Sequence, residues 1–460
     1  MIADVVVLGA GPAGLAAAWY ATRRGLSVAV IDRATHVGGL AASIVVDGQR
    51  VDLGSHRLHP SIRPDLLADL QRLLGGTLQS RPRNGRIRLD GRWVAFPLNP
   101  SDFVRNAPPR FAMRVAADLA TSPLRRRAGA ESDGFLDAAR RGMGPTLTER
   151  FYGPYARKLF GVAPQSLSAE LYRRRLGARD VATVARRALR RGPRQTFWYP
   201  AGGFGQICER LAEDVAELGG DVRLATTIDR VDAGASGVTV MTARGQPIEA
   251  RTLISTIPPG DLATLAGAGP DVIEASHHLV HRGALLVYLS VPHHRYTPFD
   301  AHYFPQPDVS TARLSEPKGY RESRDDPADR SVLCAELPAT VGDESWTAPA
   351  DELADRVVRD LVACGLPDPA PRAVHVERRA RVYPVYLHGF ERDRAVFDRW
   401  VDELPNVAVI GRQGLFAHDN THHALLTGHV AAICIGTDGR LDADAWRSRR
   451  ATFADHVVED

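Results

Sequence analysis

The 460-residue chain is poor in cysteine and has no long hydrophobic run. Its four cysteines are scattered without a CxxC pair, so neither a disulfide framework nor a cysteine metal site is expected. The longest apolar runs are far shorter than a membrane span, which argues against a transmembrane segment. Met1 leads directly into the first expected strand, and we expect a cytoplasmic protein.

Motifs of several common chemistries are also missing. The sequence holds no SxxK, GxSxG, HExxH or P-loop pattern that would offer a competing reaction. It has one GxGxxG pattern behind a strand and no second, so one dinucleotide-binding domain is expected. An apolar content of 44% and a charged content of 24% are those of an ordinary globular protein. The length favours two or three domains.

Positive charge gathers in one stretch, although the net charge is only +4. Between Arg173 and Arg194 there are nine arginines and one acid, Asp180. Such a run is either a solvated helical face or a patch for an anionic substrate, an acidic partner or a membrane surface. Aromatic residues do not interrupt it, so nucleic-acid binding is not expected. We expect a small-molecule substrate, with an anionic one and peripheral membrane contact left open.

The N-terminal segment carries the most specific motif. Val5 to Leu8 form a short β-rich apolar run, and Gly9-Ala10-Gly11-Pro12-Ala13-Gly14 follows and leads into an alanine-rich helix. In this pattern the first glycine permits a tight turn, the second lets the backbone approach a pyrophosphate, and the third allows close helix–strand packing. Asp32 ends the second strand, where a carboxylate can hold a ribose hydroxyl. Arg33 and the turn Gly38-Gly39-Leu40 extend this region.

The remaining pattern predicts an α/β fold in which two domains interleave. Helical periodicity covers residues 64–74, 102–120, 135–141, 167–191, 205–218 and 420–435, and strand patterns cover 221–224, 237–240, 252–256, 283–291 and 406–410. Residues 86–96, with Asp90-Gly91 at the centre, predict a hairpin. We place a Rossmann-type, glutathione-reductase-like domain at 1–60, 196–268 and 402–440. A mixed-sheet and helical substrate domain takes 61–195 and 269–401, and a tail takes 441–460.

Several segments resemble those of known flavoproteins. These are Asp52–His59 (DLGSHRLH), Phe151–Gly161, Tyr199–Phe204 (YPAGGF), Arg313–Lys318 (RLSEPK), Tyr383–Val385 and Gly411–Phe416. Together with the N-terminal motif they resemble the FAD-dependent flavin amine oxidase superfamily, in its protoporphyrinogen-oxidase-like and UDP-galactopyranose-mutase-like subgroup. The resemblance runs in order along nearly the whole chain.

The resemblance implies FAD as the cofactor and a set of residues around it. The predicted FAD-binding residues are Gly9, Gly11, Pro12, Ala13, Gly14, Asp32, Arg33, Gly39, Leu40, Gly54, Ser55, His56, Ile228, Gly411, Arg412, Asn420 and His422. No metal is expected. The segment Asp419-Asn420-Thr421-His422-His423-Ala424 departs from the relatives' NNMDHS pattern and puts His422 where they carry an acid. Because of that exchange, the substrate of any one relative cannot simply be assigned to this chain.

The predicted catalytic residues are His56, His422, Arg313 and Tyr303. Histidine carries protons near neutral pH, and a guanidinium suits a carboxylate or phosphate. The alternative for the histidines, and for His59 and His423, is a role as cap or loop anchor. Arg313 is equally explained by a pair with Glu316. The aromatic residues Tyr152, Tyr155, Tyr199, Trp198 and Tyr303 line a pocket or simply fill the core.

Two functions remain open at this point. In the first, a substrate C–H bond delivers hydride to flavin N5, and oxygen or another acceptor reoxidises the flavin. In the second, the reduced flavin acts through N5 on a nucleotide sugar, as in UDP-galactopyranose mutase. We favour the oxidoreductase. The substrate, the electron acceptor, covalent attachment of FAD and the oligomeric state cannot be read from the sequence.

Overall fold

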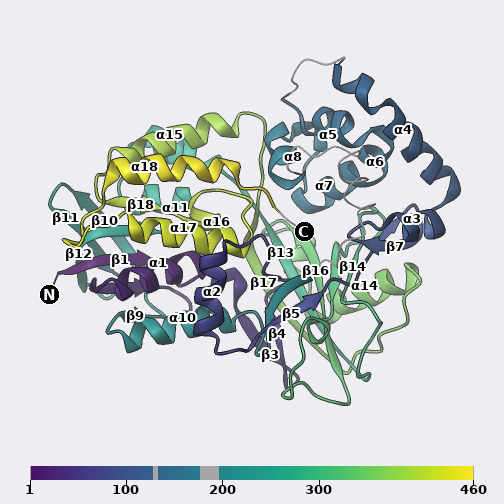
Figure 1. The fold of residues 1–460 in the computed structure, drawn as a ribbon, viewed down its shortest axis with the longest axis horizontal. Helices are drawn as coiled ribbons and strands as arrows, with labels where there is room; N and C mark the ends of the chain where they lie inside the picture. Colours follow the sequence, from purple (N-terminus) through teal and green to yellow (C-terminus); the bar gives the residue numbers. More distant parts are fainter. Residues whose placement is uncertain (1, 128–132, 177–195, 459–460) are drawn as a thin grey trace.

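The computed structural model describes residues 2–127, 133–176 and 196–458. Two seven-stranded sheets organise these residues, and a cluster of helices forms a third part beside them (Figure 1). The first sheet lies at the left of Figure 1, the second at the lower right and the helical cluster at the upper right. None of the helices in the described ranges is long and apolar enough to cross a bilayer.

The first sheet has the strand order β10-β11-β12-β1-β2-β9, with β18 also paired to β12. Its strands are β1 (Ala3–Leu8), β2 (Val28–Ile31), β9 (Asp221–Arg223), β10 (Ile228–Gly234), β11 (Gly237–Thr242), β12 (Pro247–Ser255) and β18 (Val407–Val409). The strands β12, β1, β2 and β9 run parallel, and β18 is parallel to β12. Val5 to Leu8 are fully buried in β1, as the apolar run predicts. The strands of this sheet come from three separate stretches of the chain.

Helices pack on the first sheet around α1 (Pro12–Arg23), which contacts both α17 (Thr421–Ile433) and α10 (Gln206–Glu217). The α1–α17 contact is close because Gly428 has no side chain: a Cβ there would collide with the backbone of Ala13 and Ala17. The other helices of this half are α2 (Pro64–Leu73), α11 (Pro259–Leu265), α12 (Pro270–His277), α15 (Phe390–Asp402), α16 (Gly411–Gly414) and α18 (Ala443–Ala451).

The second sheet has the order β17-β13-β16-β15-β14-β6-β7. Its strands are β6 (Gly85–Leu89), β7 (Arg92–Phe96), β13 (His281–Val291), β14 (Ala301–Tyr303), β15 (Arg313–Ser315), β16 (Ser331–Ala339) and β17 (Ala373–Pro384). The predicted hairpin is confirmed as the antiparallel pair β6–β7. Helix α14 (Ala350–Ala363) packs on β13 and β17, and α13 spans Glu344–Thr347. Two small sheets pair β3 (Ser43–Val46) with β4 (Gln49–Asp52) and β5 (Leu78–Pro82) with β8 (Thr196–Pro200).

The helical cluster is built from α3 to α8. Its helices are α3 (Pro100–Asn106), α4 (Pro109–Arg127), α5 (Phe135–Met143), α6 (Pro145–Leu147), α7 (Gly153–Phe160) and α8 (Ala169–Leu176). The single helix predicted over 102–120 is wrong: Pro108-Pro109 divides it into α3 and α4, because proline has no N–H to donate and restricts the residue before it. Of the predicted helix 167–191, residues 177–191 lie outside the described part, as does most of the basic stretch.

Candidate active site

One cavity of about 1430 Å³ joins the three parts of the molecule. It runs past the glycine turn after β1, the loops after β2 and β4, the strand β17 and the start of α17. Its walls also include residues from α5, α7 and α8 of the helical cluster. Most of the residues predicted from the sequence lie along this one space.

The glycine turn forms one end of the cavity, and its three glycines differ in what they tolerate. A Cβ at Gly9 would collide with the Thr256 side chain, and one at Gly14 with the carbonyl oxygen of Gly9. A Cβ at Gly11 would meet no protein atom within 4 Å, although Gly11 lines the cavity. The fold therefore requires glycine at Gly9 and Gly14, whereas at Gly11 a ligand that approaches the backbone supplies the reason.

The same end offers positive charge from a helix and a fixed carboxylate. Gly11 is the N-cap of α1, whose first turn holds no acidic residue, so free N–H groups and the helix dipole face the cavity. Asp32 Oδ2 accepts a hydrogen bond from the Ala10 N–H at 2.7 Å, and Oδ1 accepts from the Ala34 N–H at 2.8 Å. These bonds hold the turn and leave further lone pairs on the carboxylate for a ribose hydroxyl. Arg33 and Ile228 line this end too.

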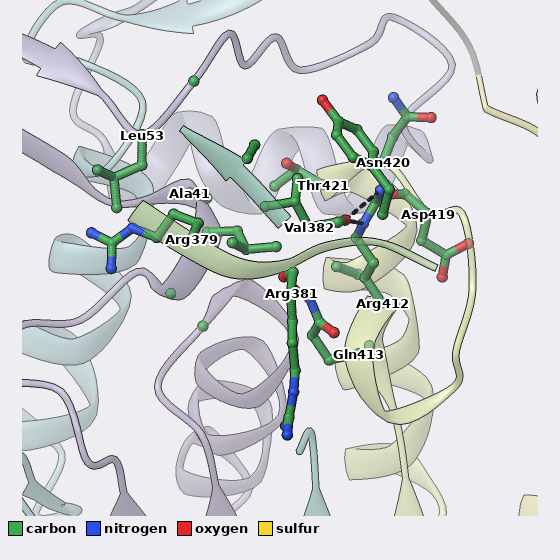
Figure 2. Close-up of a pocket in the computed structure, with 18 of the residues that line it drawn as sticks. Ala41, Leu53, Arg379, Arg381, Val382, Arg412, Gln413, Asp419, Asn420 and Thr421 are labelled. Atoms are coloured by element: carbon green, nitrogen blue, oxygen red, sulfur yellow. Dashed lines mark hydrogen bonds between the residues drawn. The ribbon is translucent and has the colours of Figure 1, made fainter. Parts of the chain in front are cut away.

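The middle of the cavity passes between β17 and the first residues of α17 (Figure 2). Arg412 donates from Nη2 to the Val382 carbonyl at 2.9 Å and from Nη1 to the Asp419 carbonyl at 3.0 Å. Figure 2 shows the guanidinium bonded to β17, while Arg381 points away from it. Arg412 thus ties the second sheet to α17. Gly39, Leu40, Gly54, Ser55, Gly411 and Asn420 also line the cavity.

Charged and hydroxyl groups gather beyond this point. Arg313 donates from Nε to Glu336 Oε1 at 2.9 Å and from Nη2 to Oε2 at 2.7 Å. Glu336 Oε1 also accepts from the Ser55 N–H at 2.8 Å. Burial raises the pKa of Tyr383 to about 12; Glu336 adds to the rise, while Arg313, Arg175 and Arg412 oppose it. The Tyr383 hydroxyl therefore keeps its proton at neutral pH.

Arg57 and Tyr303 form a second polar group at the cavity wall. Arg57 Nη2 lies 3.3 Å from Asp300 Oδ1 and 3.3 Å from the Tyr320 hydroxyl, and Nη1 lies 3.5 Å from the Tyr303 hydroxyl. Tyr303 is buried, with its ring centroid 4.7 Å from that of Phe96. Asp300 balances the charge of Arg57. The Arg57 guanidinium in turn holds the Tyr303 and Tyr320 hydroxyls in place at this wall.

The helical cluster supplies an apolar wall. It consists of Phe135, Met143, Phe151, Tyr152, Tyr155, Ala156, Leu159, Phe160 and Leu171, with Ile87, Phe96 and Leu98 from the β6–β7 region. Of the aromatic residues predicted to line a pocket, Tyr152, Tyr155 and Tyr303 do so. Trp198 and Tyr199 do not line it; Tyr199 is fully buried and donates to Asp52. Burial raises the pKa of Tyr152 and of Tyr155, so both stay neutral.

His56 lies at the cavity, and His422 does not. His56 Nε2 is 3.0 Å from the Leu53 carbonyl, which can only accept, so Nε2 carries the proton and Nδ1 is left as the acceptor. His422 lies 3.3 Å from Ser61 Oγ, and its ring is 4.0 Å from that of His423. Asp419, Asn420, Thr421 and Ala424 line the cavity, whereas His422 and His423 do not. The helical rotation of about 100° per residue thus turns His422 away from the cavity lining, and its place at the flavin stays a prediction.

The partner predicted for Arg313 also needs correction. Glu316 does not pair with it; the Glu316 carboxylate accepts from the Ser331 hydroxyl at 2.7 Å and from the Tyr296 N–H at 3.1 Å. Arg313 on β15 lies opposite Glu336 on β16 in the sheet register. Glu336, Arg57 and Arg175 line the cavity and were missed. Arg57 stands in the predicted Asp52–His59 segment and Arg175 in the basic stretch from Arg173 to Arg194, so the sequence held a signal for these two but none for Glu336.

A second cluster joins Asp419, His423 and His456 behind α17. His456 Nδ1 lies 3.2 Å from Asp419 Oδ1, and His423 Nδ1 lies 3.9 Å from the same oxygen. The two imidazole rings are stacked 4.3 Å apart at 12°, so their in-plane lone pairs cannot meet at one ion. His423 Nδ1 also accepts from the Asn420 N–H at 3.3 Å. This geometry fits a hydrogen-bonded cluster better than a metal centre.

Comparison with known proteins places this site in a family. The model of the family described as flavin containing amine oxidoreductase matches residues 12–432. The chain belongs to this family, and FAD is its cofactor. A Mycobacterium tuberculosis relative that bears the name flavin-containing monoamine oxidase AofH is 28% identical over 298 residues. The match covers 60% of this chain and 62% of that relative, so the chain spans less than two thirds of its length.

Solved structures share the fold at low sequence identity. Reduced UDP-galactopyranose mutase superposes with a TM-score of 0.79 at 21% identity, over 94% of this chain and 93% of that one. A structure from Exiguobacterium sp. 255-15 named for protoporphyrinogen oxidase gives 0.72 at 17% identity, over 93% and 97%. Cyclohexylamine oxidase from Brevibacterium oxydans gives 0.69 at 18%, over 94% and 98%. These likenesses confirm the α/β fold predicted from the sequence.

The residues around the cavity fit FAD. Gly11 and the α1 N-terminus suit the pyrophosphate, and Asp32 suits a ribose hydroxyl. The main observation in favour of FAD is the open space beside Gly11, because no protein atom there requires a glycine.

Proposed function

We propose that the protein oxidises a small-molecule substrate by hydride transfer from a C–H bond to N5 of FAD, with oxygen or another acceptor reoxidising the flavin. The observation that carries the proposal is the continuity of one cavity from the phosphate-binding turn to an apolar compartment. Cofactor and substrate can therefore share one continuous space. When bound, FAD supplies the hydride acceptor, and the protein supplies binding, orientation and exclusion of water.

The apolar wall and the polar groups divide this work. Phe135, Tyr155 and Phe160 exclude water from the compartment and can pack on a substrate's hydrocarbon body. The neutral Tyr383 hydroxyl, which donates to Glu336 Oε2 at a long 3.5 Å, can turn to donate a hydrogen bond to a substrate oxygen. His56 can take a proton at Nδ1, because the Leu53 carbonyl holds its Nε2–H. His56 is accordingly the residue we propose as proton acceptor.

The charges favour an anionic substrate over a protonated amine. Arg313, Arg175 and Arg412 lower the pKa of the Tyr383 hydroxyl, while Glu336 raises it. Glu336 is already committed to Arg313. Three guanidinium groups near one hydroxyl would repel an ammonium group and attract a carboxylate or phosphate. We therefore propose an apolar substrate that bears an anionic group.

Arginines at the cavity also support the alternative, a non-redox flavoenzyme of the UDP-galactopyranose mutase type. Arg57, Arg175 and Arg313 line the cavity, and guanidinium groups suit a nucleotide sugar's diphosphate. The apolar wall supports the oxidation, because a sugar offers little hydrocarbon surface to it.

The test is the visible spectrum of the FAD-loaded protein under anaerobic conditions while candidate substrates are added. Bleaching of the oxidised flavin band by an alcohol, amine or cyclic carboxylate establishes an oxidation and gives the substrate class. Conversion of a nucleotide sugar only after chemical reduction of the flavin supports the mutase.

The charge of the substrate is tested with 4-phenylbutyrate and 4-phenylbutylamine, which share a carbon skeleton and differ in the sign of their charge. We expect the carboxylate to perturb the spectrum at lower concentration. Tighter binding of the amine would contradict an anionic substrate.

A further inference from the structure

The last described residues of the chain lie against the cavity. Val458 lines it, and its N–H donates to the Arg174 carbonyl on α8 at 2.7 Å. We call Phe453 to Val458 the C-terminal segment. The C-terminal segment therefore contacts α8, which lies far from it in the sequence.

A buried arginine fixes the segment to the helical cluster. Arg174 is 7% exposed, and its Nη1 donates to the Phe453 carbonyl at 2.9 Å and to the His456 carbonyl at 3.2 Å. Its Nε donates to Glu170 Oε1 at 2.7 Å. A buried guanidinium needs such acceptors, since an unpaired buried charge is costly. The C-terminal segment thus provides two of the hydrogen-bond acceptors of the buried Arg174 guanidinium.

A second contact fixes the segment to Asp419, the residue before the N-cap of α17. His456 Nδ1 lies 3.2 Å from Asp419 Oδ1, and the Asp419 side chain is 1% exposed. The Asp419 carbonyl accepts from Arg412, which in turn donates to the Val382 carbonyl at the cavity. Asp419, Arg412 and Val382 all line the cavity. A connected set of hydrogen bonds therefore runs from His456 to the cavity wall.

We propose that the C-terminal segment is a clasp that completes the active-site cavity: Val458 forms part of its wall, and His456 positions Arg412 through Asp419. Val458 then limits which substrates fit, and His456 is a positioning residue. The clasp holds α8 beside α17, so both the apolar wall and the arginines depend on it.

Thiol labelling tests the clasp without any substrate. All four native cysteines are buried, so a cysteine introduced at Val458 is the site where a charged methanethiosulfonate reagent reacts. We expect Val458→Cys to react slowly in the FAD-loaded protein. Adding His456→Ala should raise the rate about tenfold, the effect of losing one charged hydrogen bond on local opening. His456→Asn should keep the rate low, because its amide nitrogen can replace Nδ1.

A second readout distinguishes a wall residue from a merely buried one. Labelling at Val458→Cys should shift the visible spectrum of the bound FAD, because the label enters the shared cavity. Labelling at Val457→Cys, whose position does not line the cavity, should leave the spectrum unchanged. Equal rates with and without His456→Ala, or an unchanged spectrum after labelling at position 458, overturn the proposal. A protein that labels as expected but bleaches with no substrate keeps the clasp and contradicts the proposed oxidation.

Discussion

Arg313 and Glu336 form a two-point ion pair across neighbouring strands, with Nε 2.9 Å from Oε1 and Nη2 2.7 Å from Oε2. The side chains are 22% and 5% exposed, so water screens the pair weakly. Glu336 fixes the guanidinium plane at the cavity wall, and Arg313 keeps further N–H groups for a ligand. The pair therefore prepares a cation with a defined orientation.

Replacing Arg313 should weaken the binding of an anion. Arg313→Met removes charged hydrogen bonds worth about 1.5–3 kcal/mol, so we expect the Kd of a carboxylate probe to rise about tenfold or more. Spectral titration of the FAD-loaded protein measures it. Arg356→Met, which breaks the surface pair with Glu352, is the control and should change nothing. Unchanged carboxylate affinity in Arg313→Met would remove Arg313 from the binding site.

Two glycine substitutions should have different effects. Gly11→Val places its Cβ in the cavity with no protein atom within 4 Å, and Gly11 has φ −83°, which any residue adopts. We expect a folded protein that lacks the yellow flavin, with an apoprotein free energy of unfolding within about 1 kcal/mol of wild type. Gly14→Ala should instead destabilise the apoprotein by roughly 1–3 kcal/mol, because its Cβ meets the Gly9 carbonyl. Full flavin absorbance in Gly11→Val would contradict the cofactor assignment.

His56→Ala should keep FAD and lose turnover. General-base catalysis contributes about 10²–10⁴-fold, so we expect kcat to fall by that order while flavin content stays normal. His59→Ala is the matched control on the same segment; His59 bonds Ser61 and does not line the cavity. Stopped-flow measurement of flavin reduction compares the two variants. Equal reduction rates would leave His56 as a loop anchor.

Local patterns predicted the N-terminal strand, the turn after it and the following helix. A strand, a glycine turn and a helix form one contiguous unit, so the spacing of Gly9, Gly11 and Gly14 fixes their geometry. The β6–β7 hairpin was predictable for the same reason, because Asp90-Gly91 sets its turn.

The catalytic end depends on relationships that no local pattern contains. The register of β15 against β16 pairs Arg313 with Glu336 and not with the nearer Glu316. His422 turns away from the cavity because of its position on the helix, which the order of residues around Asn420 does not reveal without the packing of α17 on α1. Val458 reaches the cavity through contacts with α8, far away in sequence.

Buried neutral histidines should make the protein sensitive to acid. Burial lowers the pKa of His281 and of His302 to about 4. Both pKa values lie below the unfolded value of about 6.5, so the unfolded state takes up protons first and stability falls as the pH drops below about 6.5. At about pH 5 each such histidine should lower the free energy of unfolding by roughly 2 kcal/mol.

His302→Phe keeps a ring between Trp93 and Phe299 and removes the titration. It should therefore lose less stability than wild type between about pH 7.5 and pH 5 in denaturant titrations. The control, His375→Phe at an exposed position, should follow wild type, and parallel losses in all three proteins would show that His302 does not titrate as a buried neutral group.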